Sequence, residues 1–298
     1  MTVLAGAPVM VGVDGSAGGL AAVTLAARLA ASRGRALQVI HAFMWPLMHV
    51  PLGPSPIGPP EGGLRADAER IVSDAVTLAG KVQPGLPVTG RIVTGEPAAA
   101  VLQQAHHAVM VVLGNRGLGG FTGLLLGSVA VTVTAHAPCP VVVARGELDR
   151  HHDVLVGVDG SRASADAIGF AFEEASRRGV GLNALHAYSH PISENATRMV
   201  PGILDEQLVK IEETTRAEES RVLTEAIGGW CDKYPDVSVR RTLVHGRPAQ
   251  TLVEASDRAC LAVVGSRGHG GFAGLLLGSV SQAMLHHASC PVAVVPAG

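Results

Sequence analysis

Residues 114–129 read Gly-Asn-Arg-Gly-Leu-Gly-Gly-Phe-Thr-Gly-Leu-Leu-Leu-Gly-Ser-Val, and residues 265–280 repeat this stretch with 13 of 16 positions identical. The first copy follows the apolar run at residues 109–113, which is typical of a buried strand. Each copy ends at a Ser where a short helix is expected to begin. A glycine-rich connection from a buried strand to a helix N-terminus is typical of an anion-binding loop in an α/β fold.

Three further stretches recur in the same order, so the whole chain is a tandem repeat. Val-Gly-Val-Asp-Gly-Ser occurs at residues 11–16 and 156–161, His41-Ala42 recurs as His186-Ala187, and Cys139-Pro returns as Cys290-Pro. The offset between the copies grows from 145 (186 − 41) to 151 (265 − 114), which predicts a small insertion in the second half. We place the domain boundary between residues 148 and 149, giving domains 1–148 and 149–298.

Apolar runs alternate with helical patterns in both halves. In the first half we expect strands at residues 9–13, 37–42, 88–93, 109–113 and 141–144, and helices at about 18–32 and 66–82, from Pro97, and at 128–136. This alternation predicts an α/β fold with a parallel sheet and helices on both faces. The first and fourth strands then end at one crevice, where such sheets bind ligands. The last strand of each half is an expected edge that must be covered or paired.

Composition and charge exclude several classes of partner. The 298 residues are 47% hydrophobic and carry a formal net charge of −2, which does not favour binding to nucleic acid or an anionic membrane. The N-terminal residues contain too short an apolar run for a signal peptide. Residues 117–144 carry no charged side chain apart from histidine, yet Pro138 and Pro140 favour a loop, a helix and a strand over a membrane span. We expect a soluble cytoplasmic protein.

Cysteines and histidines predict no metal site. Four cysteines stand without paired spacing, and we interpret Cys139 and Cys290 as small buried hydrophobic residues. The adjacent pairs at residues 106–107 and 286–287 are His-His, which point about 100° apart on a helix and chelate poorly. Magnesium is expected only together with a bound nucleotide.

The glycine loop itself admits two interpretations. Glycines let a backbone approach an anion closely, and Ser128 is suited to cap the following helix or to donate to a phosphate. Alternatively, the same glycines make a tight turn and allow close helix–sheet packing. The two loops stayed alike while the helices after Asp14 and Asp159 diverged, which favours a ligand. No Lys follows the glycines as in a Walker loop, and the first strand–helix turn lacks the dinucleotide-binding spacing.

Taken together, the Asp-Gly-Ser turn, the His-Ala strand end and the Gly-x-x-Gly-(nine)-Gly-Ser loop resemble the universal stress proteins, in their tandem ATP-binding form. The resemblance implies two Rossmann-like, open five-stranded parallel sheets of order 3-2-1-4-5, with Asp14 and Asp159 at the nucleotide. Backbone near Ala42 and Ala187 is then expected to meet adenine, and the glycine loops the phosphates. The predicted ATP-binding residues of the first half are Gly12, Asp14, Ala42, Gly114, Asn115, Arg116, Gly117, Leu118, Gly119, Gly120, Gly127, Ser128 and Val129. Those of the second half are Gly157, Asp159, Ala187, Gly265, Ser266, Arg267, Gly268, His269, Gly270, Gly271, Gly278, Ser279 and Val280.

The halves differ around the expected nucleotide. Gly19 stands where the second half has Ser164, which is expected to loosen the start of the first helix. The connection after Ala42 carries Met, Trp and many Pro residues up to Pro60, whereas the other continues Tyr-Ser-His-Pro from residue 188. These connections are candidate lids, so the two sites are expected to differ in affinity.

Three functions follow from these features. The first is an ATP-binding regulator of stress response or signalling with little or no turnover. The second is a slow ATPase or adenylyl-transferring enzyme, for which we assign no catalytic residue because no convincing base is present. The third is a dimerisation module that has lost ATP. Pseudo-twofold packing of the halves and a homodimer are expected, with an unknown protein partner.

Overall fold

The computed structural model describes residues 6–43, 63–117, 126–148, 150–189, 205–268 and 277–297. The first half contains β1 (Val9–Gly12), α1 (Ala17–Ser32), β2 (Leu37–Phe43), α2 (Leu64–Val82), β3 (Val88–Thr94), α3 (Pro97–Ala105), β4 (Met110–Gly114), α4 (Ser128–His136) and β5 (Val141–Ala144). The second half contains β6 (Val154–Gly157), α5 (Arg162–Arg178), β7 (Leu182–Tyr188), α7 (Asp205–Lys233), β8 (Val239–His245), α8 (Pro248–Ala255), β9 (Leu261–Gly265), α9 (Ser279–His287) and β10 (Val292–Val295). This order confirms the α/β fold.

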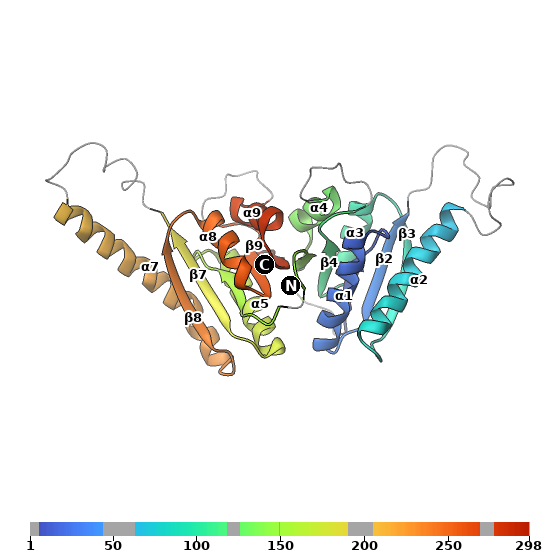
Figure 1. Ribbon diagram of the computed structural model, residues 1–298, viewed down its shortest axis with the longest axis horizontal. Helices are drawn as coiled ribbons and strands as arrows, with labels where there is room; N and C mark the ends of the chain where they lie inside the picture. Colours follow the sequence, from blue (N-terminus) through green and yellow to red (C-terminus); the bar gives the residue numbers. More distant parts are fainter. Residues whose placement is uncertain are drawn as a thin grey trace.

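The strands form one ten-stranded sheet in the order β3-β2-β1-β4-β5-β10-β9-β6-β7-β8 (Figure 1). Within each half the pairing is parallel and follows the predicted order 3-2-1-4-5. The expected two sheets are joined because β5 and β10 pair antiparallel, with Val142 opposite Ala293. Both strands are buried along their whole length, so this pairing removes two apolar edges that water would otherwise meet.

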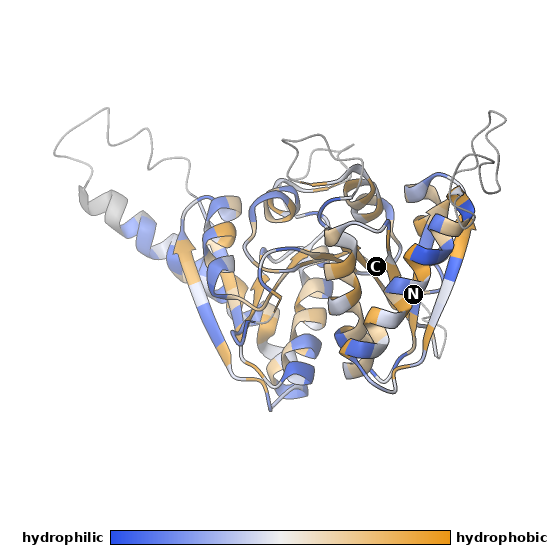
Figure 2. Cartoon of the chain, turned by 45° about the vertical axis from the view of Figure 1, so that its right-hand side comes forward, coloured by the Kyte–Doolittle hydropathy of each residue, from blue (hydrophilic) through white to orange (hydrophobic). Residues whose placement is uncertain are grey.

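Alternate residues of the central strands enter two different cores, one on each face of the sheet. In β1, Val9 and Val11 pack beneath α1 and α2, whereas Met10 packs beneath α3 and α4. Both cores continue across β5 and β10 into the second half. Figure 2 shows hydrophobic residues along the central strands and hydrophilic residues on the outward helix faces. Continuous apolar strands are what a sheet covered on both faces requires.

The predicted insertion lies between β7 and β8, where the helix is longer. Helix α7 has 29 residues and its counterpart α2 has 19. The second half also fills the space beneath this helix with aromatic rings, since Trp230 stacks on Phe172 with ring centroids 6.3 Å apart. Small residues occupy the equivalent region of the first half, where Ala75 and Ala79 of α2 are fully buried.

Two expectations about individual segments are also settled. Cys139 and Cys290 are buried, and burial raises the pKa of each thiol to about 12. The uncharged stretch 117–144 contains α4 and β5, and no helix in the described ranges is both long and apolar enough to cross a membrane.

Candidate functional site

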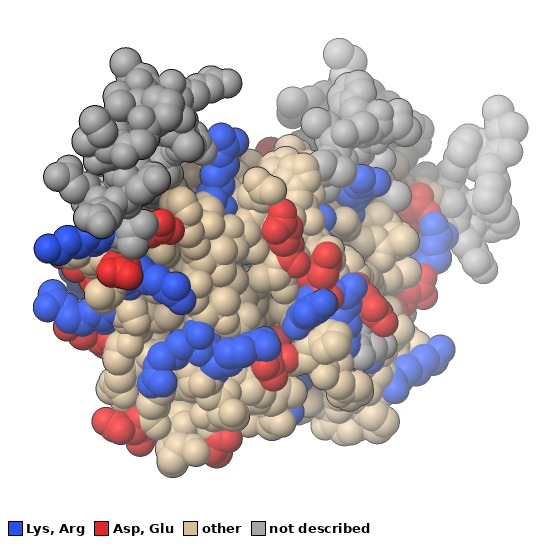
Figure 3. Space-filling view, turned by 60° about the vertical axis from the view of Figure 1, so that its left-hand side comes forward, with Lys and Arg blue, Asp and Glu red and all other residues tan. Residues whose placement is uncertain are grey.

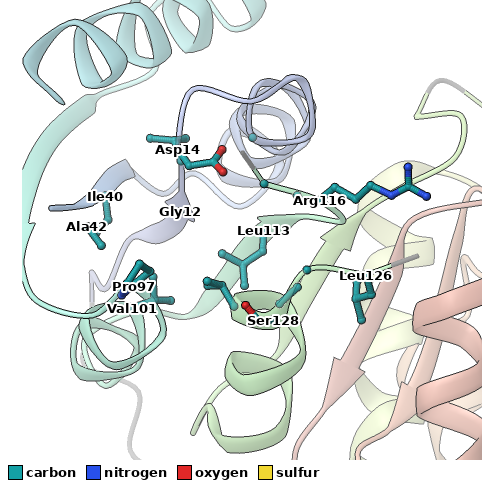
Figure 4. Close-up of a pocket in the computed structure, with 17 residues that line it drawn as sticks. Gly12, Asp14, Ile40, Ala42, Pro97, Val101, Leu113, Arg116, Leu126 and Ser128 are labelled. Carbon is teal, nitrogen blue, oxygen red and sulfur yellow. The ribbon is translucent and has the colours of Figure 1, made fainter. Parts of the chain in front are cut away.

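A cavity of about 520 Å³ opens in the first half at the carboxyl ends of β1, β2 and β4 (Figure 4). Its volume is in the range of small-molecule sites. Nine of the thirteen predicted first-half residues line it: Gly12, Asp14, Ala42, Gly114, Arg116, Gly117, Gly127, Ser128 and Val129. Leu118, Gly119 and Gly120 lie outside the described residues, as do both candidate lids, apart from their first residues. The structure thus brings the β1 turn and the glycine loop together, as the topology predicts.

One wall of the cavity is apolar and was missed from the sequence. Figure 4 shows Ile40, Pro97 and Val101 grouped with Ala42 on one side. Val101 comes from α3, whose first helical residue, Pro97, also lines the cavity. The helical pattern predicted α3 but not the face it turns to the crevice, since that face depends on how the helix crosses the sheet.

The opposite wall is the N-terminus of α4. Gly127 is the N-cap residue, and no side chain among the described residues forms a capping hydrogen bond with this helix. Its N–H donates to the Asn115 carbonyl at 2.8 Å, which holds the start of the helix against the end of β4. The first N–H groups of a helix have no intrahelical partner, and the helix dipole adds positive potential there. The prediction that Ser128 caps this helix is wrong because Ser128 is already the first helical residue, one position beyond the cap.

Asp14 and the residues around it join the two loops. The Ser16 N–H donates to Asp14 Oδ1 at 3.0 Å, so the carboxylate closes a turn ahead of α1. Ser16 caps α1 by accepting from the Gly19 N–H, and its hydroxyl donates to the Arg116 carbonyl at 3.2 Å. The Asp14 carboxylate is therefore held at the cavity while Ser16 performs the capping.

Arg116 contributes to the site mainly through its backbone. Arg116 is exposed, and in Figure 4 its side chain extends away from Asp14. The groups near an expected anion are therefore mainly backbone donors. The wider surface agrees with this, since Figure 3 shows basic and acidic side chains interspersed on the face it presents.

Glycines of the loop fall into two groups by the space around them. A Cβ on Gly114 would lie 2.5 Å from the Gly18 backbone, and one on Gly117 would lie 2.3 Å from Asp14 Oδ2. Close packing against backbone therefore accounts for Gly114, and a Cβ on Gly117 would displace the Asp14 carboxylate. Among the described residues, a Cβ on Gly127 would meet nothing closer than 3.7 Å, and this residue has an ordinary φ of −75°. Neither contacts with the described residues nor backbone conformation excludes a Cβ at position 127.

The second half repeats this geometry. The Gly278 N–H donates to the Ser266 carbonyl at 2.9 Å, and the Ser161 N–H donates to Asp159 Oδ1 at 2.9 Å. A Cβ on Gly268 would lie 2.3 Å from Asp159 Oδ2, whereas one on Gly278 would meet nothing closer than 3.5 Å.

Other predicted residues of the second half hold the matching positions. Gly157 and Gly265 end β6 and β9, Ala187 is near the end of β7, and Ser279 and Val280 begin α9. Arg267 is exposed beside Gly268, while His269, Gly270 and Gly271 lie outside the described residues.

Comparison with known proteins gives one consistent result. The family model described as "Universal stress protein family" matches residues 7–145 and 151–296. A universal stress protein of Mycobacterium tuberculosis is 42% identical over 300 residues, covering 96% of each chain, and one of Mycolicibacterium smegmatis is 39% identical over 297 residues with the same coverage. The crystal structure of a universal stress protein from Archaeoglobus fulgidus superposes with a TM-score of 0.69 at 20% identity, covering 98% of this chain and 99% of that one. The predicted boundary at 148/149 falls between the two matched segments and remains a prediction.

Proposed function

The chain belongs to the universal stress protein family, and we propose that it binds one ATP in each half and responds to nucleotide as a regulator. Family membership supports a role in stress response. ATP fits the cavity because an apolar wall for a base faces a helix N-terminus for phosphates. The proposal rests on these opposed walls and on the repetition of the anion-binding half of the site.

One observation carries the proposal: among the described residues, a Cβ on Gly127 or on Gly278 would meet no atom closer than 3.5 Å, so packing against them does not require glycine. A methyl group on Gly127 would lie 3.7 Å from the backbone nitrogen of Gly117, and one on Gly278 would lie 3.7 Å from that of Gly268, close to a potential donor to an anion. A close-approaching ligand explains both residues, since glycine keeps these N–H groups accessible.

The residues have distinct expected roles toward ATP. Ile40, Val101 and the backbone near Ala42 would enclose the adenine, and Asp14 would face the sugar or a Mg²⁺ that accompanies the phosphates. The N–H groups at Gly117 and at the start of α4 would hold the phosphates. Ser128 would add a hydroxyl donor.

We expect little or no turnover. Among the described residues that line the cavity, Asp14 is the single carboxylate and there is no His, Lys or Glu. Phosphoryl transfer requires a positioned cation and a group that orients the nucleophile, and the Arg116 side chain extends away from Asp14. A slow ATPase or adenylyl-transferring enzyme is the alternative, favoured by the presence of Asp14 in the same cavity. Sustained phosphate release from ATP at more than about one per second would establish it, since typical enzymes reach 1–10³ s⁻¹.

Calorimetric titration of ATP in the presence of Mg²⁺ tests the binding. The unmodified chain should bind two equivalents. In Gly127→Ala and in Gly278→Ala one site should weaken tenfold to a hundredfold, as expected when a hydrogen bond to a charged group is lost.

Gly80→Ala is the matched control. Gly80 lies on α2 with nothing within 4 Å of its would-be Cβ, so the variant should bind ATP like the unmodified chain. Unchanged ATP affinity in both loop variants, or no ATP binding to the unmodified chain, contradicts the proposal.

A further inference from the structure

The two halves provide an internal comparison of the same site. Several positions around the expected nucleotide differ in chemistry, and three of them bear on binding here: Gly19, Glu96 and Ala130 of the first half correspond to Ser164, Arg247 and Ser281 of the second. Gly19 and Ala130 line the first-half cavity directly, and Glu96 precedes Pro97, which also lines it.

Ser281 connects the two parts of the second anion-binding loop. It is the third residue of α9, is 2% exposed, and its hydroxyl donates to the Gly265 carbonyl at 2.7 Å. The Ser266 carbonyl lies 3.3 Å from the same oxygen. Ser281 therefore ties the first turn of α9 to the end of β9. Ala130 cannot make this bond. Among the described residues of the first half, these parts are joined by the hydrogen bond from the Gly127 N–H to the Asn115 carbonyl, whose equivalent is also present in the second half.

Ser164 braces the opposite side of the same site. Its hydroxyl accepts from the Asp159 N–H at 3.2 Å, and the residue is buried. Gly19, its counterpart, has no side chain to make such a bond. Both strand ends that carry the second site are thus fixed by an additional side-chain hydrogen bond. A site fixed in advance loses less conformational freedom on binding.

The charge at the rim of the site also favours binding of an anionic ligand by the second half. Glu96 accepts from the N–H groups of Ala98 and Ala99 at 3.1 and 2.8 Å, so its negative charge lies at the start of α3 beside the cavity. Arg247 occupies the equivalent position before α8, which has no side-chain cap. A cation in place of an anion favours a ligand that carries several negative charges.

We propose that the two sites are unequal, that the second half binds ATP more tightly and fills first, and that Ser281 is its positioning residue. This inference rests on the proposed ATP binding and assigns a difference between the two copies of the site.

Single-site backgrounds separate the halves. In Gly127→Ala the tighter binding measured by calorimetry reports the second half, and in Gly278→Ala it reports the first. The dissociation constant for ATP should be at least about fivefold lower in the Gly127→Ala background, the effect expected of one additional hydrogen bond.

Reciprocal exchange tests Ser281 itself. Ser281→Ala in the Gly127→Ala background should weaken ATP about fivefold, and Ser281→Thr should restore it by returning the hydroxyl. Ala130→Ser in the Gly278→Ala background should strengthen ATP binding to the first half, which a merely structural role for Ser281 would not produce.

The possible outcomes distinguish failure of this inference from failure of the proposed function. Equal affinities in the two backgrounds, a tighter first half, or a Ser281→Ala variant that unfolds earlier in urea with unchanged ATP affinity would overturn the inference alone. Absence of ATP binding to the unmodified chain would contradict the proposed function, and the inference with it.

Discussion

At the scale of single residues, the glycines of the loop motif are glycine for different reasons. Gly117 has no room for a side chain because the Asp14 carboxylate occupies the space where a Cβ would stand. At Gly127, by contrast, a Cβ would meet no described atom closer than 3.7 Å. Packing accounts for one glycine of the motif and the proposed ligand for the other, so substitutions at the two positions should have different consequences.

Gly117→Ala should lower the free energy of unfolding by about 1–3 kcal/mol, as overpacking does, while Gly127→Ala should change it by less than about 0.5 kcal/mol. Urea unfolding of both variants measures this difference. The cost of Gly117→Ala should shrink when Asp14→Ala removes the opposing carboxylate. Equal destabilisation by the two alanine variants would contradict the assignment.

At the scale of elements, the halves cover the same sheet face differently. Gly169 in α5 lies under the Trp230 ring of α7, and a Cβ there would lie 2.5 Å from Trp230 Cη2. The ring packs against both Phe172 and Tyr234, with centroids 6.3 Å away in both cases, and those two rings contact each other at 5.9 Å, so the Trp230 ring has little freedom to move. A glycine inside α5 thus makes space for a large residue on the neighbouring helix.

Gly169→Ala should destabilise the protein by about 1–2 kcal/mol, although alanine is normally the better helix former by about 1 kcal/mol. Gly228→Ala is the control, because Gly228 is inside α7 with nothing within 4 Å of its would-be Cβ, and this change should stabilise. In the Trp230→Ala background, Gly169→Ala should stabilise the protein instead of destabilising it, because the ring that opposes the new Cβ is gone. Thermal unfolding of Gly169→Ala, Gly228→Ala, Trp230→Ala and the Gly169→Ala/Trp230→Ala double variant measures these changes in stability. A stabilising Gly169→Ala in the unmodified chain would refute the explanation.

At the scale of the whole molecule, the halves are joined by a sheet and by charges buried between them. Glu174 of α5 is 1% exposed and pairs with Arg33 of the first half and with Arg178. Arg145, which follows β5, donates to the carbonyl of His286 at 3.0 Å and to that of Leu285. It thereby provides hydrogen-bond partners for carbonyl groups at the C-terminal end of α9. Burial lowers the pKa of Arg33 to about 10.

Glu174→Ala should lower the free energy of unfolding by about 3–5 kcal/mol, because it leaves the buried Arg33 without its carboxylate. Replacing both, as Arg33→Leu with Glu174→Leu, should recover most of this loss, since Arg178 is 24% exposed and can reach water. Urea unfolding measures both. A double variant as unstable as the single one would show that the loss does not come from the unpaired cation.

The expected homodimer remains a prediction. Because β5 and β10 pair within the chain, a dimer must use another surface than these strand edges. Sedimentation should give a mass of twice 30.5 kDa, and a species of 30.5 kDa at micromolar concentration would count against it.

Sequence alone determined the repeat, the element order and the meeting of the Asp14 turn with the glycine loop. These follow from local patterns and from the restricted topology of parallel sheets. The sequence also identified nine lining residues, because they fall in three short stretches, at residues 11–16, 41–42 and 114–129, that recur in the second half.

Tertiary structure decided what depends on contacts between distant segments. The resemblance implied pairing of the last strands between domains, and the structure decided that this pairing occurs within the chain. The apolar wall from α3, the N-cap position of Gly127 and the different surroundings of Gly117 and Gly127 also arise where elements meet. Whether a position has space for a side chain is set by neighbours far away in the chain, and no local pattern records that distance.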